Sequence, residues 1–186
     1  MIEDQTFTGK DYTTSGFPKG KYDNCIFDNC QFNDTDLSGV DFISCRFVAC
    51  DWSNTKLGGT SLKDVHFESC KMVGTAFHDC NKLLLALKFD GCLLEYASFV
   101  SLPMRLTVFN DCKMHEVDFS NTDLREAKFD DCDLLRTVFE TTNLAKADFT
   151  TAYNYSLDPA SNNIKKAKFS ADGLKGLLIK YGIVVV

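Results

Sequence analysis

The chain has 186 residues, enough for one domain with a large buried interior, and its hydrophobic content of 45% argues against disorder. Its formal net charge of −6 argues against direct DNA binding, because DNA-binding proteins need cations that displace counterions from phosphates. No run of eighteen apolar residues occurs, and the first residues lack the basic and apolar regions of a signal peptide, so the sequence predicts a cytoplasmic protein that does not enter a membrane.

Residues 1–21 carry aromatic side chains at a spacing of five, at Phe7, Tyr12 and Phe17. The small residues that flank later aromatic positions are missing from this stretch. The sequence therefore predicts an N-terminal cap or a distorted first coil, which a solenoid needs at an open end.

From residue 22 onward, a large apolar residue recurs every five positions, and all sixteen phenylalanines of the chain lie in one of two phases of this period. A small residue, often cysteine or threonine, stands two positions before each large one. A period of five fits neither a helix at 3.6 residues nor a strand at two. It predicts a short extended stretch and a corner in every repeat, with two side chains pointing inward and three outward.

A longer period of twenty residues appears in six Phe-x-x-Cys stretches. They lie at residues 27–30, 47–50, 67–70, 89–92, 109–112 and 129–132. One step is twenty-two residues long, because two residues are inserted near 81–86. Since the series resumes in phase, we interpret the insertion as a bulge or a short corner loop within one domain, with a functional hinge as the alternative.

Several repeats resemble the pentapeptide repeat family, whose consensus places Leu or Phe after Ala-Asp or Ala-Asn. They read Thr-Asp-Leu-Ser-Gly at residues 35–39, Asn-Thr-Asp-Leu-Arg at 121–125 and Leu-Ala-Lys-Ala-Asp-Phe at 144–149. The resemblance implies an all-β fold, a right-handed quadrilateral β-helix with four pentapeptides in each coil. Roughly seven coils would then stack about 4.8 Å apart, the spacing of paired strands.

Residues 150–163 lose the pattern, and Asp158-Pro159 predicts a turn within them. Ile164 and Phe169 restore the phase for a last partial coil. The repeat domain is therefore predicted to span residues 22–169.

Residues 170–186 differ in character from the repeats. Ser170-Ala171-Asp172 is a helix start signal, leucines follow at helical spacing, and 183–186 are typical of a short strand. An uncovered apolar tail would aggregate, so the tail either caps its own rod or, as we expect, pairs with a second copy in a two-fold homodimer. The expected interface residues are Leu174, Leu177, Leu178, Tyr181, Ile183 and Val185.

The nine cysteines all occupy the small inner position, and six of them form one column. Stacked thiols neither converge as zinc ligands nor lie at disulfide distance, so we expect small buried hydrophobic side chains. His66, His78 and His115 fall on outward positions of different coils without a catalytic partner. The sequence thus predicts a protein that is not an enzyme and holds no metal and no cofactor.

Acidic residues recur at outward positions and are expected to stack into a row along one edge of the rod. They are Asp28, Glu68, Asp90, Asp111, Asp118, Asp130, Asp131 and Asp133. A line of negative charge imitates the phosphates of duplex DNA and attracts proteins whose clefts bind DNA. The alternative is a solvated face that only keeps the protein soluble.

Residues 173–185 are similar to the ends of the Qnr-type quinolone-resistance proteins and of the microcin B17 immunity protein. This resemblance implies a dimeric DNA mimic that binds DNA gyrase or topoisomerase IV and modulates it, or protects it from quinolones or a gyrase toxin. Plasmid-borne members carry two larger projecting loops, whereas this chain offers the insertion at 81–86 and the segment 150–163. The alternative function is a structural or protein-interaction scaffold with an unrelated partner.

Overall fold

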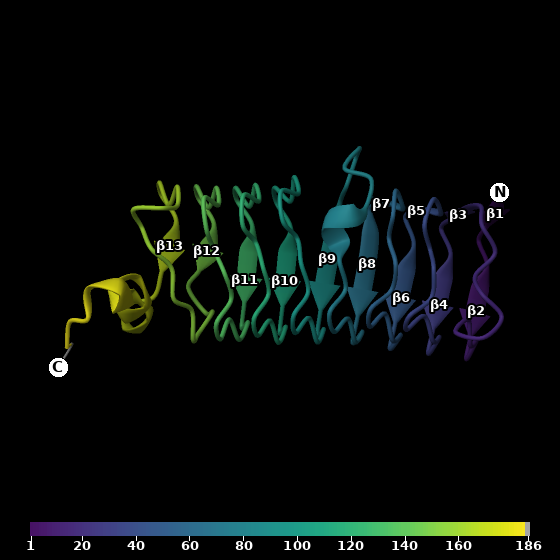
Figure 1. The fold of residues 1–186 in the computed structure, drawn as a ribbon, viewed down its shortest axis with the longest axis horizontal. Coiled ribbons are helices and arrows are strands. Elements are labelled where there is room, and N and C mark those ends of the chain that lie inside the picture. The colour runs from purple at the N-terminus through teal and green to yellow at the C-terminus, as the bar shows by residue number, and fades with distance from the viewer. Residues whose placement is uncertain (185–186) are drawn as a thin grey trace.

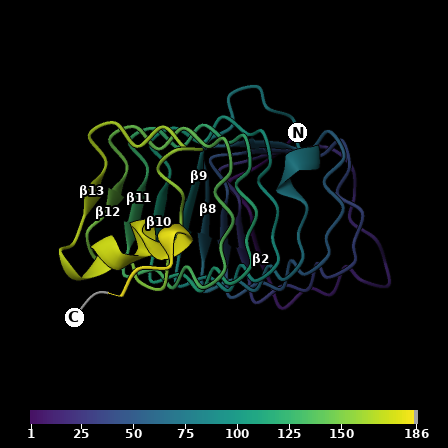
Figure 2. The same ribbon diagram turned by 60° about the vertical axis from the view of Figure 1, so that its left-hand side comes forward.

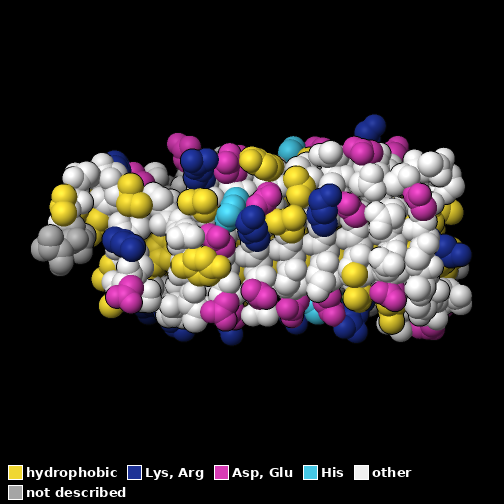
Figure 3. Space-filling view, turned by 90° about the horizontal axis from the view of Figure 1, so that it is seen from below, with side chains coloured by type: hydrophobic (Ala, Val, Ile, Leu, Met, Phe, Trp, Pro, Cys, Tyr) yellow, Lys and Arg dark blue, Asp and Glu magenta, His cyan; other side chains and the backbone are white. Residues whose placement is uncertain are grey.

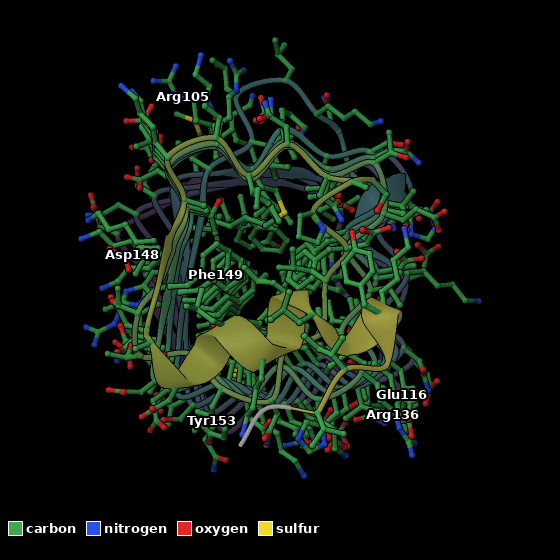
Figure 4. All side chains as sticks on the ribbon, turned by 90° about the vertical axis from the view of Figure 1, so that its left-hand side faces the viewer. Arg105, Glu116, Arg136, Asp148, Phe149 and Tyr153 are labelled. Carbon is green, nitrogen blue, oxygen red and sulfur yellow. The ribbon has the colours of Figure 1, made fainter. Side chains whose placement is uncertain are left out.

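Parallel strands wind into a rod of about eight turns in the computed structural model, which describes residues 1–184 (Figure 1). Viewed along the rod axis, each turn is a quadrilateral (Figure 4). We number its faces in chain order, so that face 1 carries Phe109, face 2 Met114, face 3 Phe119 and face 4 Leu124. The predicted all-β solenoid is confirmed, with about one turn more than expected.

Face 1 carries a parallel sheet of nine strands whose register is set by the twenty-residue period. Phe109 pairs with Phe89 on one side and with Phe129 on the other. The strands are β2 (Thr6–Thr8), β4 (Ile26–Asp28), β6 (Arg46–Val48), β8 (Val65–Glu68), β9 (Leu87–Asp90), β10 (Val108–Asn110), β11 (Lys128–Asp130), β12 (Asp148–Phe149) and β13 (Lys168–Phe169).

The other faces pair more sparsely. Face 4 has a sheet of four strands, β1 (Ile2–Glu3), β3 (Lys21–Asp23), β5 (Asp41–Ile43) and β7 (Ser61–Lys63). Beyond β7, face 4 continues as isolated bridges such as Asp123 to Asn143. Bridges also connect the turns on faces 2 and 3, where the 3-10 helix η1 (Phe77–Asp79) replaces one repeat corner (Figure 2).

A corner lies two positions after each central residue, where the backbone φ is positive. Asn54 has a φ of 53° and Gly74 a φ of 69°, a region that Asn, Asp and Gly tolerate better than other residues. Three bulky residues, Leu84, Tyr96 and Leu106, also adopt φ values between 58° and 64°. The corners therefore turn the chain toward the next face and hold their side chains outward.

The interior is built from stacked aromatic rings. On face 1 the phenylalanine rings stack nearly parallel from Phe7 to Phe169, with centroids 4.6 to 5.4 Å apart. A second ladder on face 3 meets the first edge to face, as Phe119 does with Phe109 at 5.7 Å and 74°. Both arrangements are favourable for aromatic pairs. Each fully buried ring contributes roughly 1.5–3 kcal/mol through burial alone.

The small inner residues satisfy backbone carbonyls of the previous turn. The Thr122 hydroxyl donates to the Phe99 carbonyl at 2.8 Å, and the Thr142 hydroxyl donates to the Phe119 carbonyl at 2.9 Å. The Cys70 thiol makes the equivalent bond to the Phe47 carbonyl at 3.3 Å. All nine cysteines are buried and free of disulfides. The small inner position therefore suits a short side chain that carries a hydrogen-bond donor.

The two inserted residues form a loop that rises above β8 and β9 (Figure 1, teal). The chain leaves face 4 at Asn81, which bridges to Ser61, and enters face 1 at Leu87, which pairs with Val65. Leu83 and Leu84 at its tip are exposed. The insertion is thus a projecting corner loop, and it ends the four-stranded sheet of face 4.

The N-terminal residues 1–21 form the first turn of the rod. Strand β2 places Phe7 opposite Phe27 in the same register as later turns. Phe17 is only 6% exposed and packs its ring against Tyr12 at 4.8 Å. These aromatic rings fill the N-terminal end of the interior.

Residues 150–163 complete a turn despite their irregular sequence. Tyr153 bridges to Asp133 and Asn163 bridges to Asn143. Tyr155, which lies outside the five-residue phase, and Leu157, which takes the small inner position of its repeat, are buried and fill the interior there. The chain turns at 158–161, as Asp158-Pro159 predicted.

The C-terminal segment differs from the prediction. Instead of one regular helix, two short 3-10 helices form, η2 (Asp172–Leu177) and η3 (Ile179–Tyr181), and they lie across part of the rod end (Figure 4). Two glycines within six residues weaken an α-helix, and Gly176 is buried against Tyr155. Residues 183–184 are not in a strand, and the rest of the strand predicted at 183–186 lies outside the described residues.

Candidate functional site

Most of the predicted acidic residues meet at the corner between faces 1 and 2. Six residues share one column on the face 1 sheet, in the order Asp28, Val48, Glu68, Asp90, Asn110 and Asp130. Asp111 and Asp131 follow at the adjoining corner position, each with a positive φ. The fold therefore brings carboxylates from successive turns together along this edge.

Five of these carboxylates have no ion-pair partner among residues 1–184, namely Asp28, Asp90, Asp111, Asp130 and Asp131. The last four lie on neighbouring turns, and we call Asp90, Asp111, Asp130 and Asp131 the acidic row. Asp90 accepts one hydrogen bond, from the Asn110 amide at 3.0 Å. The three turns that carry the row are about 4.8 Å apart, and the uncharged Asn110 stands between Asp90 and Asp130 in their column. The row is therefore a short ladder of free negative charge over β9 to β11.

Toward the N-terminal end, the predicted edge is interrupted and partly neutralised. Val48, which stands between Asp28 and Glu68, is an uncharged member of the column. Glu68 receives two hydrogen bonds from the Arg46 guanidinium, and these bonds lower the pKa of the Glu68 carboxyl. His66 lies 2.9 Å from the same carboxylate. Glu68 is therefore held within its own rod and is less available to a partner.

Two of the predicted acidic residues lie on other faces. Asp118 belongs to face 3, where it bridges to Ser98 and Val138, so its assignment to the acidic edge was wrong. It stands one position before Phe119, a central residue half a turn away from face 1.

Asp133 lies on face 2 and is occupied by neighbours of the same rod. His115 contacts its carboxylate at 2.7 Å and the Asn154 amide donates to it at 2.8 Å. Burial acts to raise the pKa of Asp133, but these hydrogen bonds outweigh it and the pKa lies below its usual value. Asp133 is therefore an internal structural partner beside the acidic row.

Tyr153 was not identified from the sequence as part of this surface. Its side chain projects from face 2 at the C-terminal end of the rod, and the residue is 50% exposed (Figure 4). Burial raises the pKa of its hydroxyl, and the negative charges of Asp133 and Asp111 raise it further. The sequence did contain a signal for it, because Tyr153 comes twenty residues after Asp133 and therefore lies one turn further along the same column.

The faces beside this corner show how charge is distributed. Seen from below, face 2 has Asp and Glu side chains along both long edges, where Lys and Arg also occur, and acidic, basic and hydrophobic side chains mixed between them (Figure 3). The Lys113 ammonium lies 2.7 Å from Glu95 within this middle zone. The free negative charge is therefore at the edge, and the middle of the face is compensated.

The predicted interface residues at the C-terminus differ in exposure. Leu174, Tyr181 and Ile183 are exposed by 47%, 59% and 54%. Leu177 packs partly against the core and Leu178 is half-buried. Val185 lies outside the described residues.

Further apolar side chains join this end of the rod. Ile179 is 58% exposed, and together with Tyr153 and Leu135 it lines a groove of about 550 Å³ between η3 and face 2. The C-terminal segment thus presents a half-open apolar surface rather than a closed cap.

Residues 1–184 contain no group of three or more His, Cys, Asp or Glu side chains placed to hold a metal ion. Burial raises the pKa of the Cys45 and Cys80 thiols to about 11, so both remain protonated at neutral pH. In the described part of the chain, no helix is long and apolar enough to cross a membrane. The chemistry that the geometry supports is recognition by charge and by apolar contact.

Comparison with known proteins identifies relatives by fold. The family model described as a pentapeptide repeat region matches residues 21–99 and 82–149. No curated protein matches the sequence.

Two solved structures of QnrB1, a plasmid-mediated fluoroquinolone resistance protein, are similar over the whole chain. A trypsin-treated variant has a TM-score of 0.65 at 18% identity, with 100% of this chain and 99% of that chain covered. The full-length protein has a TM-score of 0.60 at 18% identity, with 97% and 99% covered. HetL, from the cyanobacterium Nostoc sp. strain PCC 7120 and involved in heterocyst differentiation regulation, has a TM-score of 0.51 at 14% identity, with 91% and 86% covered.

Proposed function

The chain belongs to the pentapeptide repeat family, and we propose that it is a non-enzymatic, cytoplasmic DNA mimic that binds a type II topoisomerase. DNA gyrase and topoisomerase IV are the candidate partners. Binding would modulate the enzyme or protect it from quinolones or a gyrase toxin.

The observation that carries this proposal is the acidic row. Asp90, Asp111, Asp130 and Asp131 present unpaired carboxylates on three successive turns of one edge, and the turns are about 4.8 Å apart. A protein that binds DNA aligns arginine and lysine side chains with phosphates, and such side chains form strong charge-assisted bonds with carboxylates too. The match of fold and length with QnrB1, whose described property is fluoroquinolone resistance, selects topoisomerases as the first partner to test.

We propose a second copy of the chain as the occupant of the C-terminal apolar surface. Ile179, Tyr181 and Ile183 are each more than half exposed at one end of the rod. A two-fold dimer through this end buries the same side chains of both copies. It also places two acidic rows on one long particle.

The dimer is tested by the mass of the particle in solution. Light scattering during gel filtration should give about twice the chain mass of 20.8 kDa. The double variant Ile179→Glu, Ile183→Glu should give the single mass, because two buried carboxylates in each copy oppose association. A monomeric wild-type protein at 100 µM would exclude this interface.

The topoisomerase proposal is tested by DNA supercoiling with purified gyrase, with and without a quinolone. The wild-type chain should change supercoiling or restore it in the presence of the drug. The triple variant Asp111→Lys, Asp130→Lys, Asp131→Lys should reduce this effect at least tenfold, because cations then face a cationic cleft.

A matched control carries the same charge change on face 4, as Asp23→Lys, Asp41→Lys, Asp64→Lys. It should keep the activity within about twofold of wild type, since rim charges away from an interface contribute little. Equal losses in both triple variants would show that only net charge matters. No response of gyrase or topoisomerase IV to the wild-type chain would end the proposal.

A protein-interaction scaffold with an unrelated partner is the second candidate, and one observation favours it. On face 1, the column on the other side of the central phenylalanines is basic, with Arg46, Lys88 and Lys128 beside the acidic column. The negative stripe is thus narrower than a DNA duplex. If topoisomerases do not respond, a partner with a small basic patch is the remaining explanation of the acidic row.

A further inference from the structure

A second charged edge runs along the corner between faces 4 and 1 in the C-terminal half of the rod. We call it the basic edge, and its cations are Arg105, Arg125, Lys128, Lys146, Lys165, Lys166 and Lys168. The outward positions of the same stretch hold three carboxylates, Asp123, Glu126 and Asp148. Seven cations against three carboxylates leave a net charge of +4 on this edge.

The fold places these cations in columns. On face 4, the Leu106 N–H donates to the Arg125 carbonyl and the Lys146 N–H donates to the Lys165 carbonyl, so successive turns stack directly. On face 1, Lys128 pairs with Asp148, which pairs with Lys168. In Figure 4 the labelled Arg105 and Asp148 lie on either side of this corner, on the opposite end of face 1 from the acidic row.

The cations lie outside the carboxylates that accompany them. The Arg105 side chain is 54% exposed, and Glu126, which it contacts at 2.7 Å, is 31% exposed. The Lys168 side chain is 66% exposed over Asp148 at 19%. A partner therefore meets positive charge first, with the carboxylates beneath holding the long side chains upright.

Three of the cations have no ion-pair partner among residues 1–184, namely Lys128, Lys165 and Lys166. Asn143 and Asn163 add a neutral ladder beside them, with the Asn163 amide donating to Asn143 at 3.0 Å. Lysine and asparagine side chains together are typical of contacts to phosphate oxygens.

The composition of the edge favours a nucleic acid over an acidic protein. Protein interfaces are centred on buried aromatic or aliphatic anchors. One exposed large apolar side chain, Leu106, lies at the N-terminal end of the basic edge beside Arg105 and is 61% exposed. From residue 107 to 170, the exposed large apolar side chains are Leu135, Val138 and Tyr153, and all of them belong to faces 2 and 3. The edge from Arg125 to Lys168 therefore offers charge and polar groups without an apolar centre, as phosphate contacts require.

The net charge of −6 does not reveal the basic edge, because acidic and basic side chains gather at different corners of the rod. On face 1, Asp130 and Asp131 of the acidic row stand two and three positions after Lys128 of the basic column, at distances of about 7 and 10 Å along the chain. Both distances are within or close to the Debye length of about 10 Å at 0.1 M salt. The acidic row therefore weakens the attraction of the basic edge for phosphates without abolishing it.

From these observations we propose that the basic edge binds the phosphate backbone of a nucleic acid without sequence preference. This inference does not depend on topoisomerase binding, which uses the opposite corner of face 1.

The test is fluorescence anisotropy with a labelled 24-base-pair DNA duplex and the full chain, in 25 to 200 mM NaCl. The wild-type chain should bind with a Kd of roughly 1–100 µM, the range of nonspecific binding, and affinity should fall steeply with salt. The triple variant Lys128→Gln, Lys165→Gln, Lys166→Gln should weaken binding at least tenfold at 50 mM NaCl. Its salt dependence should have a slope smaller by about 2–3.

The matched control Lys10→Gln, Lys56→Gln, Lys71→Gln has the same net charge and should bind within twofold of wild type. The variant Asp111→Asn, Asp130→Asn, Asp131→Asn should bind the duplex more tightly at low salt while losing its effect on gyrase. The affinity for DNA and the effect on gyrase should therefore change in opposite directions, which separates the two proposals. Absence of duplex binding at 25 mM NaCl, or equal weakening by both lysine triples, would overturn the inference. Tighter binding of polyglutamate than of DNA would also overturn it and would assign the edge to an acidic protein.

Discussion

Phe119→Asp should destabilise the rod by about 7 kcal/mol. Phe119 is fully buried, and its ring stacks on Phe99 at 5.1 Å and on Phe139 at 5.6 Å. Its edge also meets Phe109 and Phe129 of the other ladder. One ring therefore connects three successive turns and both aromatic ladders.

The expected loss in the free energy of unfolding exceeds the lower end of the range found for native domains. Removing a buried phenylalanine side chain costs about 3–5 kcal/mol, and a carboxylate without a partner in an apolar interior adds several kcal/mol. Native domains are stable by only about 5–15 kcal/mol. Because each turn of a solenoid is stabilised by its neighbours, the damage spreads to the turns on both sides.

Thermal unfolding followed by circular dichroism is the measurement. A loss of about 7 kcal/mol corresponds to a fall in Tm of about 15–30 °C for a chain of this size. Phe119→Leu, which keeps an apolar side chain, should remain folded with a smaller loss. Val138→Asp is the control, because it introduces the same charge on the same face at a residue that is 42% exposed, and its Tm should change by less than about 3 °C. A cooperative transition at the wild-type temperature for Phe119→Asp would contradict the ladder.

The periodicity of the sequence was sufficient to predict this interior. Phe119 was predicted to point inward from its position in the five-residue phase alone. Each repeat has two inward positions, and Phe119 occupies the central one, where it is buried. The same rule placed the nine cysteines inside. Tyr155 did not follow the rule, because the five-residue phase places Asn154 at the centre of this repeat, whereas the irregular segment buries the residue after it.

Positions on the surface were harder to assign because the period of five does not say which face a residue occupies. Asp118 and Asp130 both stand one position from a central phenylalanine, but two repeats separate them, so they lie on faces 3 and 1. Reading the chain in steps of twenty from Asp28 would have excluded Asp118. The basic edge was missed for the same reason, because a net charge of −6 averages over corners that carry opposite signs.

The structure of the C-terminal segment could not be predicted from the repeat period. Leucines at helical spacing predicted a helix, but Gly173 and Gly176 lie against Tyr155, where there is no room for a Cβ atom. A Cβ atom at Gly173 would lie 2.0 Å from the Tyr155 hydroxyl oxygen. Such a close approach depends on where Tyr155 stands in the last turn, which local sequence does not show.

Gly176→Ala should therefore release the C-terminal segment from the rod. A Cβ atom at this position would lie 2.3 Å from the Tyr155 carbonyl oxygen, which belongs to the backbone and cannot rotate away. The Gly176 carbonyl also accepts a hydrogen bond from the Leu157 N–H at 3.2 Å, so a shift of the helix breaks this bond as well. Overpacking of this kind costs about 1–3 kcal/mol.

Hydrogen–deuterium exchange of residues 172–181 measures the release directly. In Gly176→Ala these amides should exchange at least tenfold faster, while strands β9 to β11 keep their protection, because the repeats do not depend on the tail. Gly182→Ala is the matched control, since its Cβ would have no atom within 4 Å, although its φ of +60° adds local strain. If the segment also holds the dimer together, the Gly176 variant loses half its particle mass and the control does not. Unchanged exchange in Gly176→Ala would show that the contact with Tyr155 does not fix the segment, and the apolar surface at this end would then have to be stabilised by the second copy alone.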